Sequence, residues 1–335
     1  MPVRHRGYHH WDGELGSARW SWLAILGNGL KLGMQQRHAA LLLWAGLPLA
    51  LVAGVLFYFM AVFQEGRPSD LVGSEQLGFL FGILGLGRPR GVLAIQDMIL
   101  PMWTLVFTRL CQAQLVLVLL VQAKFGSDSV AGDLRTNALP IYFSKPITLS
   151  TYLLGKWLVL VSFTLAVTLV PSLIAYAAGM LLSGPGTELG LTAGLLGRVV
   201  IQSLLVAGMA SLTVLAMSSL TRDKRLVAVG WVALALVPMI VQGLFDAMLP
   251  AERLRGLLGS LSLPRNINRL TYWLLDVERA VQTSPAPELF AKAAGRDALG
   301  VGLGYAIAVL AAITAVSLII CVKRVRRFQV AVANA

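Results

Sequence analysis

The residue types that usually carry chemistry are few in this chain, and none of them has the spacing of a catalytic site. Cys111 and Cys321 fall within separate apolar runs, and no Cys or acidic cluster has the spacing of metal ligands. All four histidines precede the first long apolar run: His5, His9, His10 and His38. We therefore expect no catalytic residue, metal or bound cofactor on this chain, which makes a membrane-embedded enzyme the least favoured class.

A nucleotide-binding loop of the GxxxxGK[ST] type is also missing from the sequence. The only Gly-Lys pair, at Gly155 and Lys156, is followed by Trp157 and lies at the edge of an apolar run. Loops of this type hold phosphates through their backbone N–H groups and the Lys side chain. Any ATP chemistry must therefore come from another chain.

One polar stripe lies inside an apolar run and is a candidate translocation path. At 100° per residue its members fall on one side of a helix, and they are Thr104, Thr108, Arg109 and Gln112. An arginine at such a depth is expected to face a partner helix or a wet cavity rather than lipid. Two interpretations stay open: the wall of a transport path, or a hydrogen-bond network between helices.

The composition places these residues in a membrane protein. Of the 335 residues, 57% are hydrophobic and only 13% are charged, whereas about 25% are charged in soluble domains. Crossing a bilayer takes about 20 residues of helix. Six runs reach that length: 39–63, 99–123, 152–182, 191–220, 226–249 and 298–322. The predicted fold class is an all-α integral membrane protein with six transmembrane helices.

The distribution of basic residues predicts the orientation of these helices. With both termini cytoplasmic, the inner segments hold 16 Lys and Arg residues and 5 acidic residues, and the outer segments hold 10 of each. Basic residues gather on the cytoplasmic side of membrane proteins, where anionic lipid attracts them. Topology thus explains the net charge of +12, and we expect membrane lipid, not nucleic acid, as the partner of this charge.

Polar segments before and between the apolar runs have patterns of their own. Within residues 1–38 an apolar helical face alternates with a polar one, which predicts an amphipathic helix lying on the inner leaflet. The apolar face is made of Leu23, Leu26, Leu30 and Met34. Residues 76–87 are too short to span and are expected to be interfacial or re-entrant. Arg198, near the outer end of the fourth run, is expected to snorkel.

The stretch 126–156 is unusually long for a turn between two membrane helices. Ser127 or Asp128 is predicted to cap a short helix that exposes Asp133 and Arg135. Further along, Asn137 and Pro140 are expected to end this helix, Pro146 to fix a turn, and Ser150 to cap the third span. The segment is thus predicted to be a rigid elbow able to pass a soluble partner's motion into the spans, and the alternative is a solvated loop.

The elbow carries the residues that resemble a known family. The run from Asp133 to Lys156, with Tyr-Phe-Ser-Lys-Pro-Ile and Tyr-Leu-Leu-Gly-Lys, resembles the signature of the ABC type-2 (ABC-2) permeases, the membrane subunits of ATP-driven exporters. The frame is similar as well, with an interfacial N-terminal helix, six spans and a long outer segment after the fifth span. In that segment, LSLPRNINRLTYWLLDVERAV resembles the stretch in which the family places re-entrant helices.

The resemblance implies roles for particular residues. A cytoplasmic coupling helix between spans 2 and 3 would dock into the ATPase subunit through Asp133, Leu134, Arg135, Thr136, Asn137, Ala138 and Leu139. The return path into the third span would be set by Lys145, Pro146, Gly155 and Lys156. The implied organisation is a leader with an interfacial helix (1–38), a permease domain (39–322) containing a coupling segment (126–156) and an outer segment (250–297), and a basic cytoplasmic tail (323–335).

The function implied by the resemblance is a permease subunit that couples ATP hydrolysis to substrate export across the bacterial inner (plasma) membrane. Its partners would be two copies of a cytoplasmic ABC ATPase, which carry ATP and Mg, and a second permease, identical or homologous. The alternative from another class is an ATP-independent channel or secondary carrier, for which midplane acids or broken helices would be typical. Nothing in the sequence names the transported molecule.

Overall fold

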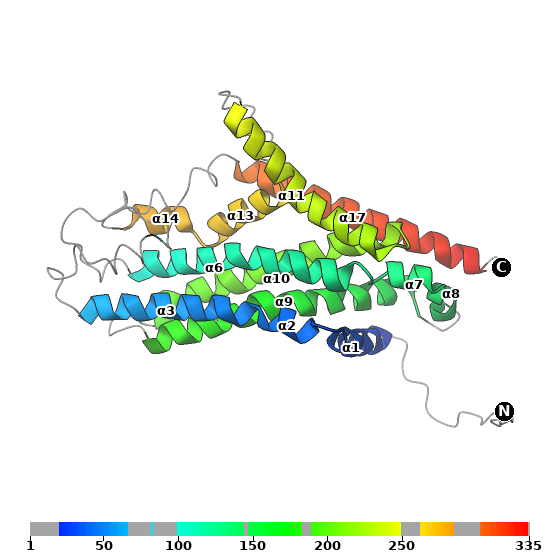
Figure 1. The fold of residues 1–335 in the computed structure, drawn as a ribbon, viewed down its shortest axis with the longest axis horizontal. Helices are drawn as coiled ribbons and strands as arrows, with labels where there is room; N and C mark the ends of the chain where they lie inside the picture. Colours follow the sequence, from blue (N-terminus) through cyan, green and yellow to red (C-terminus); the bar gives the residue numbers. More distant parts are fainter. Residues whose placement is uncertain are drawn as a thin grey trace, which may run out of the picture.

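Every regular element in the described part of the chain is a helix. The computed structural model describes residues 20–65, 82, 99–143, 147–182, 189–248, 262–284 and 302–333. The longer helices run along one another as an elongated bundle (Figure 1). In chain order the elements are α1 (Ser21–Met34), α2 (Ala39–Trp44), α3 (Gly46–Glu65), α6 (Ile99–Val121), the π-helix η3 (Gln122–Gly126), α7 (Ala131–Arg135), α8 (Ala138–Phe143), α9 (Leu149–Leu182), α10 (Leu189–Leu220), α11 (Lys224–Met248), α13 (Leu263–Leu274), α14 (Val277–Gln282) and α17 (Leu303–Ala333).

The expected number of membrane-spanning helices is confirmed in length and composition. Among the described residues, six stretches are long and apolar enough to cross a bilayer: Ala39–Ala61, Ile99–Arg135, Leu149–Leu182, Thr192–Leu220, Lys224–Val241 and Leu303–Arg327. In a hydrocarbon core such stretches form helices because each backbone N–H and C=O group must find its partner within the chain. The molecule is therefore an all-α protein of the multi-pass membrane type.

The boundaries of three spans differ from those predicted. The first run is divided into α2 and α3, which meet at Ala45. The second continues past 123 through η3 to Gly126. The last helix continues through Ala333 and takes up most of the basic tail. Hydropathy alone locates where a helix is apolar, not where its backbone hydrogen bonds stop.

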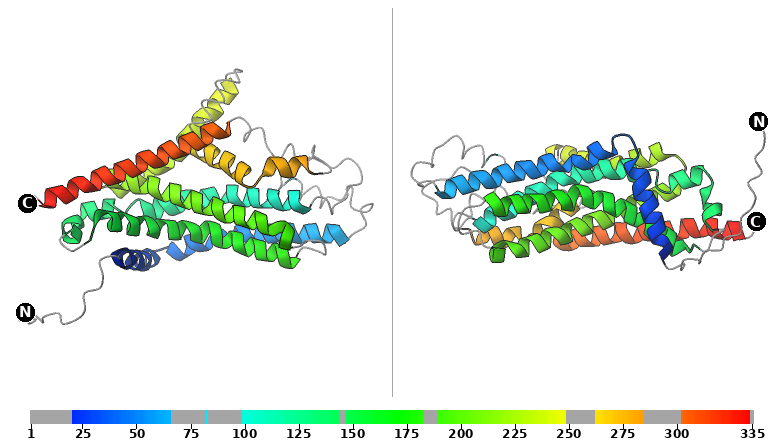
Figure 2. Two further views of the ribbon diagram at one scale, coloured as in Figure 1. Left: turned by 180° about the vertical axis from the view of Figure 1, so that it is seen from behind. Right: turned by 90° about the horizontal axis from the view of Figure 1, so that it is seen from below.

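The two ends of the bundle carry different short elements. At one end lie α1, α7, α8 and the C-terminal end of α17, and at the other lie α14 and the N-terminal end of α6 (Figure 1). We call these the α7 end and the α14 end. At the α7 end, α1 runs crosswise to the long helices (Figure 2). The short helices therefore form two separate groups that the spans connect.

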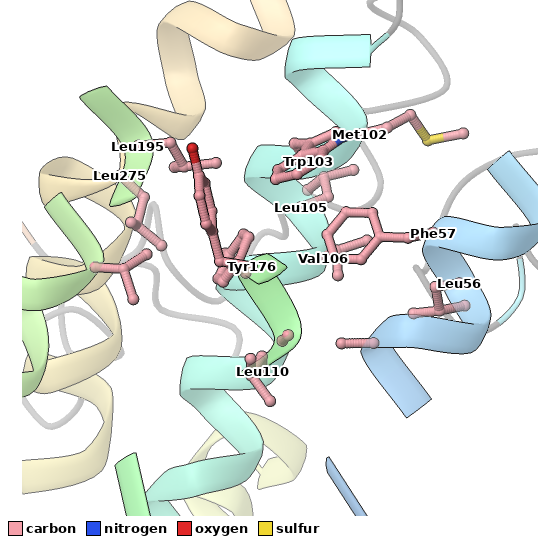
Figure 3. Packing of buried hydrophobic residues seen from close by; sticks show 14 of the residues in the cluster. Leu56, Phe57, Met102, Trp103, Leu105, Val106, Leu110, Tyr176, Leu195 and Leu275 are labelled. Carbon is pink, nitrogen blue, oxygen red and sulfur yellow. The ribbon is translucent and has the colours of Figure 1, made fainter. Parts of the chain in front are cut away.

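The core near the α14 end is built on aromatic side chains from three helices. Trp103 of α6 is fully buried, with its ring centre 4.4 Å from that of Phe57 on α3 and 5.6 Å from that of Tyr176 on α9. Figure 3 shows Leu195 and Leu275 completing this cluster from α10 and from the turn before α14. Edge-to-face and tilted ring pairs of this kind hold helices in a fixed relative position.

A second core lies at the α7 end and joins the short helices to the spans. Phe125 and Phe163 stack with ring centres 4.3 Å apart and planes 9° apart. Leu134 of α7, Leu139 of α8 and Val325 of α17 are buried in the same cluster. The short helices are therefore part of the folded core and not appendages of it.

Helices α11 and α17 are the least buried of the spans. Only 17% of the apolar stretch on α11 and 22% of that on α17 is enclosed by the protein, against 56% for α9. Trp231 fixes α11 by donating its indole N–H to the carbonyl of Leu119 at 3.0 Å. The C-terminal half of α11 points away from the bundle (Figure 1).

Some predicted features lie outside the described residues. These are residues 1–19, the segment 76–87 apart from residue 82, and the outer-segment stretches 250–261 and 285–297. Within 262–284, where re-entrant helices were expected, the structure has the two short helices α13 and α14. An ion pair of 2.9 Å between Arg269 and Glu278 joins them.

Candidate functional site

The α7–α8 elbow (residues 127–143) is the candidate site, because it links α6 to α9 through two short helices in contact with each other. Asn137 separates the two helices with φ at 51°, in the left-handed region. Asn accepts this conformation more readily than most residues, which makes it a common helix terminator. The prediction that Asn137 ends the first helix is confirmed. Pro140 instead lies in the first turn of α8, where the missing N–H costs little.

The start of α7 is capped by a residue from another span. Ser218 of α10 accepts hydrogen bonds from the N–H groups of Val130 and Ala131, at 3.0 and 2.9 Å. It donates its own proton to the carbonyl of Ser127 at 3.1 Å. The prediction of a local cap by Ser127 or Asp128 is therefore wrong, because the N-cap position is Val130 and no side chain of the elbow caps it.

Asp133 forms the centre of a second connection, between α7 and α9. Its carboxylate lies 2.8 Å from Lys156 Nζ and accepts a hydrogen bond of 2.6 Å from the Tyr152 hydroxyl. Lys156 also donates to the carbonyl of Ser129 at 2.8 Å. Asp133 was predicted to be exposed, but its side chain is only 14% exposed. Pairing with a lysine 23 positions later removes the carboxylate from solvent.

Tyr142 of α8 lies beside this ion pair. Partial burial, followed by the nearby Asp133 charge, raises the pKa of the Tyr142 hydroxyl above its usual value of about 10. The hydroxyl is therefore protonated at neutral pH. Its ring centre lies 5.8 Å from that of Tyr152, so α8 contacts the same part of α9 that holds Asp133.

The tip of the elbow is exposed to solvent. Arg135, Thr136 and Asn137 are exposed, and Arg135 makes a 3.3 Å surface ion pair with Asp128. Leu134 and Leu139 on either side are buried. The seven residues expected to form a docking helix thus divide into an inward apolar set and an outward polar tip, with Asp133 inside and Ala138 half-buried.

The return path from the elbow into α9 begins with a local cap. Thr148 accepts a hydrogen bond of 3.3 Å from the Thr151 N–H, so Thr148 and not Ser150 caps the third span. Lys145 and Pro146 lie outside the described residues.

Gly155, on the first turns of α9, lets α1 come close to this span. A Cβ at Gly155 would lie 2.8 Å from Ile25 of α1. On the facing helix, Gly29 contacts Val159 and Gly33 contacts the ring of Phe163. Small residues one turn apart let helix backbones approach each other in this way.

Only part of the predicted apolar face of α1 packs against the protein. Leu26 and Leu30 lie against the core at the α7 end, but Leu23 and Met34 are 44% and 53% exposed.

A cavity of about 570 Å³ lies between α1 and the elbow. Its wall combines apolar residues of α1 and α9 with Asp133, Arg135 and Lys156. Each of these three charged groups has an ion-pair partner, because Arg135 pairs with Asp128 and Asp133 with Lys156. Asp128 also lines the cavity, so that two acidic and two basic groups leave its wall with no net charge.

The candidate transport stripe on α6 is divided by the structure. Thr104 and Thr108 are buried and donate their hydroxyl protons to carbonyls of their own helix, those of Leu100 at 2.9 Å and Thr104 at 2.6 Å. Both hydroxyl groups thus donate to their own helix, and neither bond joins a threonine to Arg109 or Gln112.

Arg109 and Gln112 make the connection between α6 and the outer segment. The Arg109 guanidinium donates to the Gln112 side-chain oxygen at 2.9 Å, and the Gln112 amide donates to the Tyr272 hydroxyl on α13 at 3.4 Å. Arg198, expected to snorkel, lies 3.3 Å from Asp276 between α13 and α14. Both polar groups thus hold the short helices of the α14 end.

Two buried glutamines were missed by the sequence reasoning. Gln122 of η3 donates to Thr164 on α9 and to Ser211 on α10, both at 2.8 Å. Gln114 donates to the carbonyl of Thr168 at 3.0 Å and to the Ser172 hydroxyl at 3.1 Å. A glutamine within an apolar run must find such partners, and that signal was present in the sequence.

The described residues contain no group of three or more His, Cys, Asp or Glu side chains that could hold a metal ion. Cys111 and Cys321 are both buried free thiols. Neither a scan against protein-family models nor a search of curated proteins gives a match for this chain.

Proposed function

We propose that this chain is the transmembrane permease subunit of an ATP-driven exporter of the ABC type-2 kind. In this proposal a separate ATPase hydrolyses ATP, the α7–α8 elbow receives its motion, and the spans carry the motion to the transport path. The permease acts with a second permease and with two ATPase copies that hold ATP and Mg. The chain itself supplies binding and mechanical coupling and no catalysis.

The observation that carries the proposal is the anchoring of the elbow. Ser218 binds its first turn to α10, and the ion pair of Asp133 with Lys156 binds it to α9. The tip at Arg135 to Asn137 remains exposed for a partner. A solvated loop would need none of these connections, whereas an element that transmits force needs rigid attachment to more than one span.

The path of transmission would run through polar groups that connect the helices. Gln122 joins the end of α6 to both α9 and α10 directly beside the elbow. In the middle of α6, Gln112 accepts a hydrogen bond from Arg109 and donates one to Tyr272 of α13. A motion of the elbow would thus reach the α14 end along α6, which is where an outer gate would lie.

The proposed orientation has the α7 end in the cytoplasm of a bacterial cell, with the helices in the inner membrane. This orientation places the basic residues of α17 and the turn before α11 beside anionic lipid. It also places α1, which runs crosswise to the spans, at the level of the inner leaflet (Figure 2). Export is the proposed direction because the resembling family mostly exports.

The test is ATPase retention by the purified protein. The double variant Arg135→Ala with Ile141→Ala removes two exposed side chains of the elbow, Ile141 being 64% exposed, and leaves Asp133 and Ser218 in place. The matched control is Arg326→Ala with Val322→Ala, an exposed pair on α17. Both variants and the wild type are purified from native membranes, and bound P-loop ATPase is measured by mass spectrometry together with ATP hydrolysis.

We expect the wild type and the control to retain the ATPase and the elbow variant to lose most of it, by about tenfold or more, since two central contacts are worth at least 1.4 kcal/mol together. Equal retention by the elbow variant would disprove docking at this tip. Transport by the purified chain in vesicles without ATP would favour a channel or secondary carrier instead.

A further inference from the structure

A basic pocket of about 510 Å³ lies at the α7 end and adjoins the cavity between α1 and the elbow, with which it shares Gln36 and Asp128. It is formed where the turn after α1, the π-helix η3 and the start of α11 meet. Four basic side chains line it, and the only acidic one is Asp128. The basic residues are Arg37, Lys124, Lys224 and Arg225.

The nearby carboxylates do not neutralise the pocket. Asp128 is shared between Arg135 at 3.3 Å and Lys224 at 3.6 Å. Asp223 is not among the lining residues, and its carboxylate accepts a hydrogen bond of 2.8 Å from the backbone N–H of Arg225 at the start of α11. The lining therefore carries a net charge of about three positive units at neutral pH.

Exposed apolar side chains lie four residues away in the sequence from three of the basic residues. Leu41 of α2 follows Arg37, which lies in the turn before that helix, and is 72% exposed. On α6, Leu120 precedes Lys124 by four and is 47% exposed. The same spacing recurs on α11, where Val229 follows Arg225 and is 66% exposed. On α11 the two residues lie on one face, because residues four apart in an α-helix do so.

We propose that this pocket binds the head group of an anionic phospholipid, with its acyl chains lying on the apolar faces of α2, α6 and α11. The phosphate would sit among the bases at the level where an inner-leaflet head group lies, and each base near such a surface attracts it. The exposed apolar residues Leu41, Leu120 and Val229 would contact its acyl chains. A soluble anion would match the bases but not these side chains.

The bound lipid would also stabilise the position of α11. Helix α11 is the least enclosed span. Its N-terminal part contacts the bundle through Trp231 and through the ion pair of Lys224 with Asp128. A phosphate contacted from α2, η3 and α11 would join the start of α11 to the rest of the bundle. The site does not depend on the ATPase proposal.

Binding can be measured by native mass spectrometry of the purified full-length chain with added phosphatidylglycerol, phosphatidylcholine or inorganic phosphate. The test variant is Lys124→Gln with Arg225→Gln. The control is Lys323→Gln with Arg327→Gln, which changes one lysine and one arginine at the same end of α17, outside the pocket.

We expect wild type and control to bind phosphatidylglycerol in preference to phosphatidylcholine. The test variant should bind phosphatidylglycerol about 30-fold more weakly, because it loses two basic residues worth about 1 kcal/mol each and about 1.4 kcal/mol corresponds to a tenfold change in affinity. Equal binding of the two lipids by the wild type would overturn the proposal without reference to any variant. Equal weakening in the control would show a diffuse surface charge, and competition by millimolar inorganic phosphate would show a free-anion site; either result would overturn the proposal.

Discussion

At the start of α7 one hydroxyl from a distant helix replaces the usual local cap. Ser218 uses its full capacity there, with one proton donated to Ser127 and two bonds accepted from Val130 and Ala131. Buried backbone N–H groups that lose their partner are costly. The hydroxyl therefore connects the stability of the elbow with its position on α10.

We predict that Ser218→Ala destabilises the protein by about 2 kcal/mol, because it leaves two buried N–H groups unpaired. The adjacent Ser219→Ala is the control. Ser219 is equally buried but only donates to the carbonyl of Ala216 in its own helix, at 2.7 Å. Thermal unfolding in detergent should give a clearly lower Tm for the first variant than for the second. Equal Tm values would mean that Ser218 does not support α7.

Individual residues were the least predictable part of the site. Asn137 was recognised because its chemistry acts locally, through its own backbone. Asp133 was predicted to be exposed, because its partner Lys156 is distant in the sequence. The role of Ser218 was not predicted, because it is a single hydroxyl within an apolar run. Side-chain hydrogen bonds between spans depend on tertiary packing, which periodicity does not encode.

Among the elements, α1 depends most on close backbone approach. Its packing on α9 uses Gly29 and Gly33 on one side and Gly155 on the other. In contrast, a Cβ at Gly27 of the same helix would meet no atom within 4 Å. The two kinds of glycine should therefore respond in opposite ways to the same substitution.

We predict that Gly27→Ala stabilises the protein by up to about 1 kcal/mol, since alanine is the better helix former. Gly33→Ala should destabilise it, because the new methyl would be forced against the Phe163 ring, which is stacked on Phe125. The measurement is the Tm of each variant in one detergent. Stabilisation by both would show that α1 does not pack closely on α9.

The spans were predictable because a single property, an apolar run of sufficient length, determines them. Their terminal turns were not. The first span is divided at Ala45, and the π-turn of η3 is where Gln122 makes its hydrogen bonds with Thr164 and Ser211 of other spans. Re-entrant helices in the outer segment were expected from the resemblance and not from hydropathy, and the short helices α13 and α14 lie in that stretch.

The membrane orientation of the whole molecule can be tested, because the elbow and α14 lie at opposite ends of the bundle (Figure 1). Both native cysteines are buried, so that a new exposed cysteine would dominate the labelling. Thr136 in the elbow and Thr283 after α14 are both exposed.

We predict that Thr136→Cys reacts with a membrane-impermeant maleimide only in inside-out vesicles, and that Thr283→Cys reacts in cells whose outer membrane has been opened. The charge distribution gives the reason, since the bases of the α7 end favour the cytoplasm. The cysteine-containing parent serves as the background. The reverse pattern would refute the orientation and with it any cytoplasmic ATPase at the elbow.

The π-turn at Gln122–Gly126 has a consequence for tracing the ancestry of this protein. A π-turn arises by insertion of one residue into an α-helix, and one residue corresponds to about 100° of rotation. A homologue lacking that residue could not keep both Gln122 against Ser211 and Val130 against Ser218 in the present register. Alignments of distant homologues are therefore expected to need a one-residue gap at this turn, and that gap would mark the branches in which the elbow was reoriented.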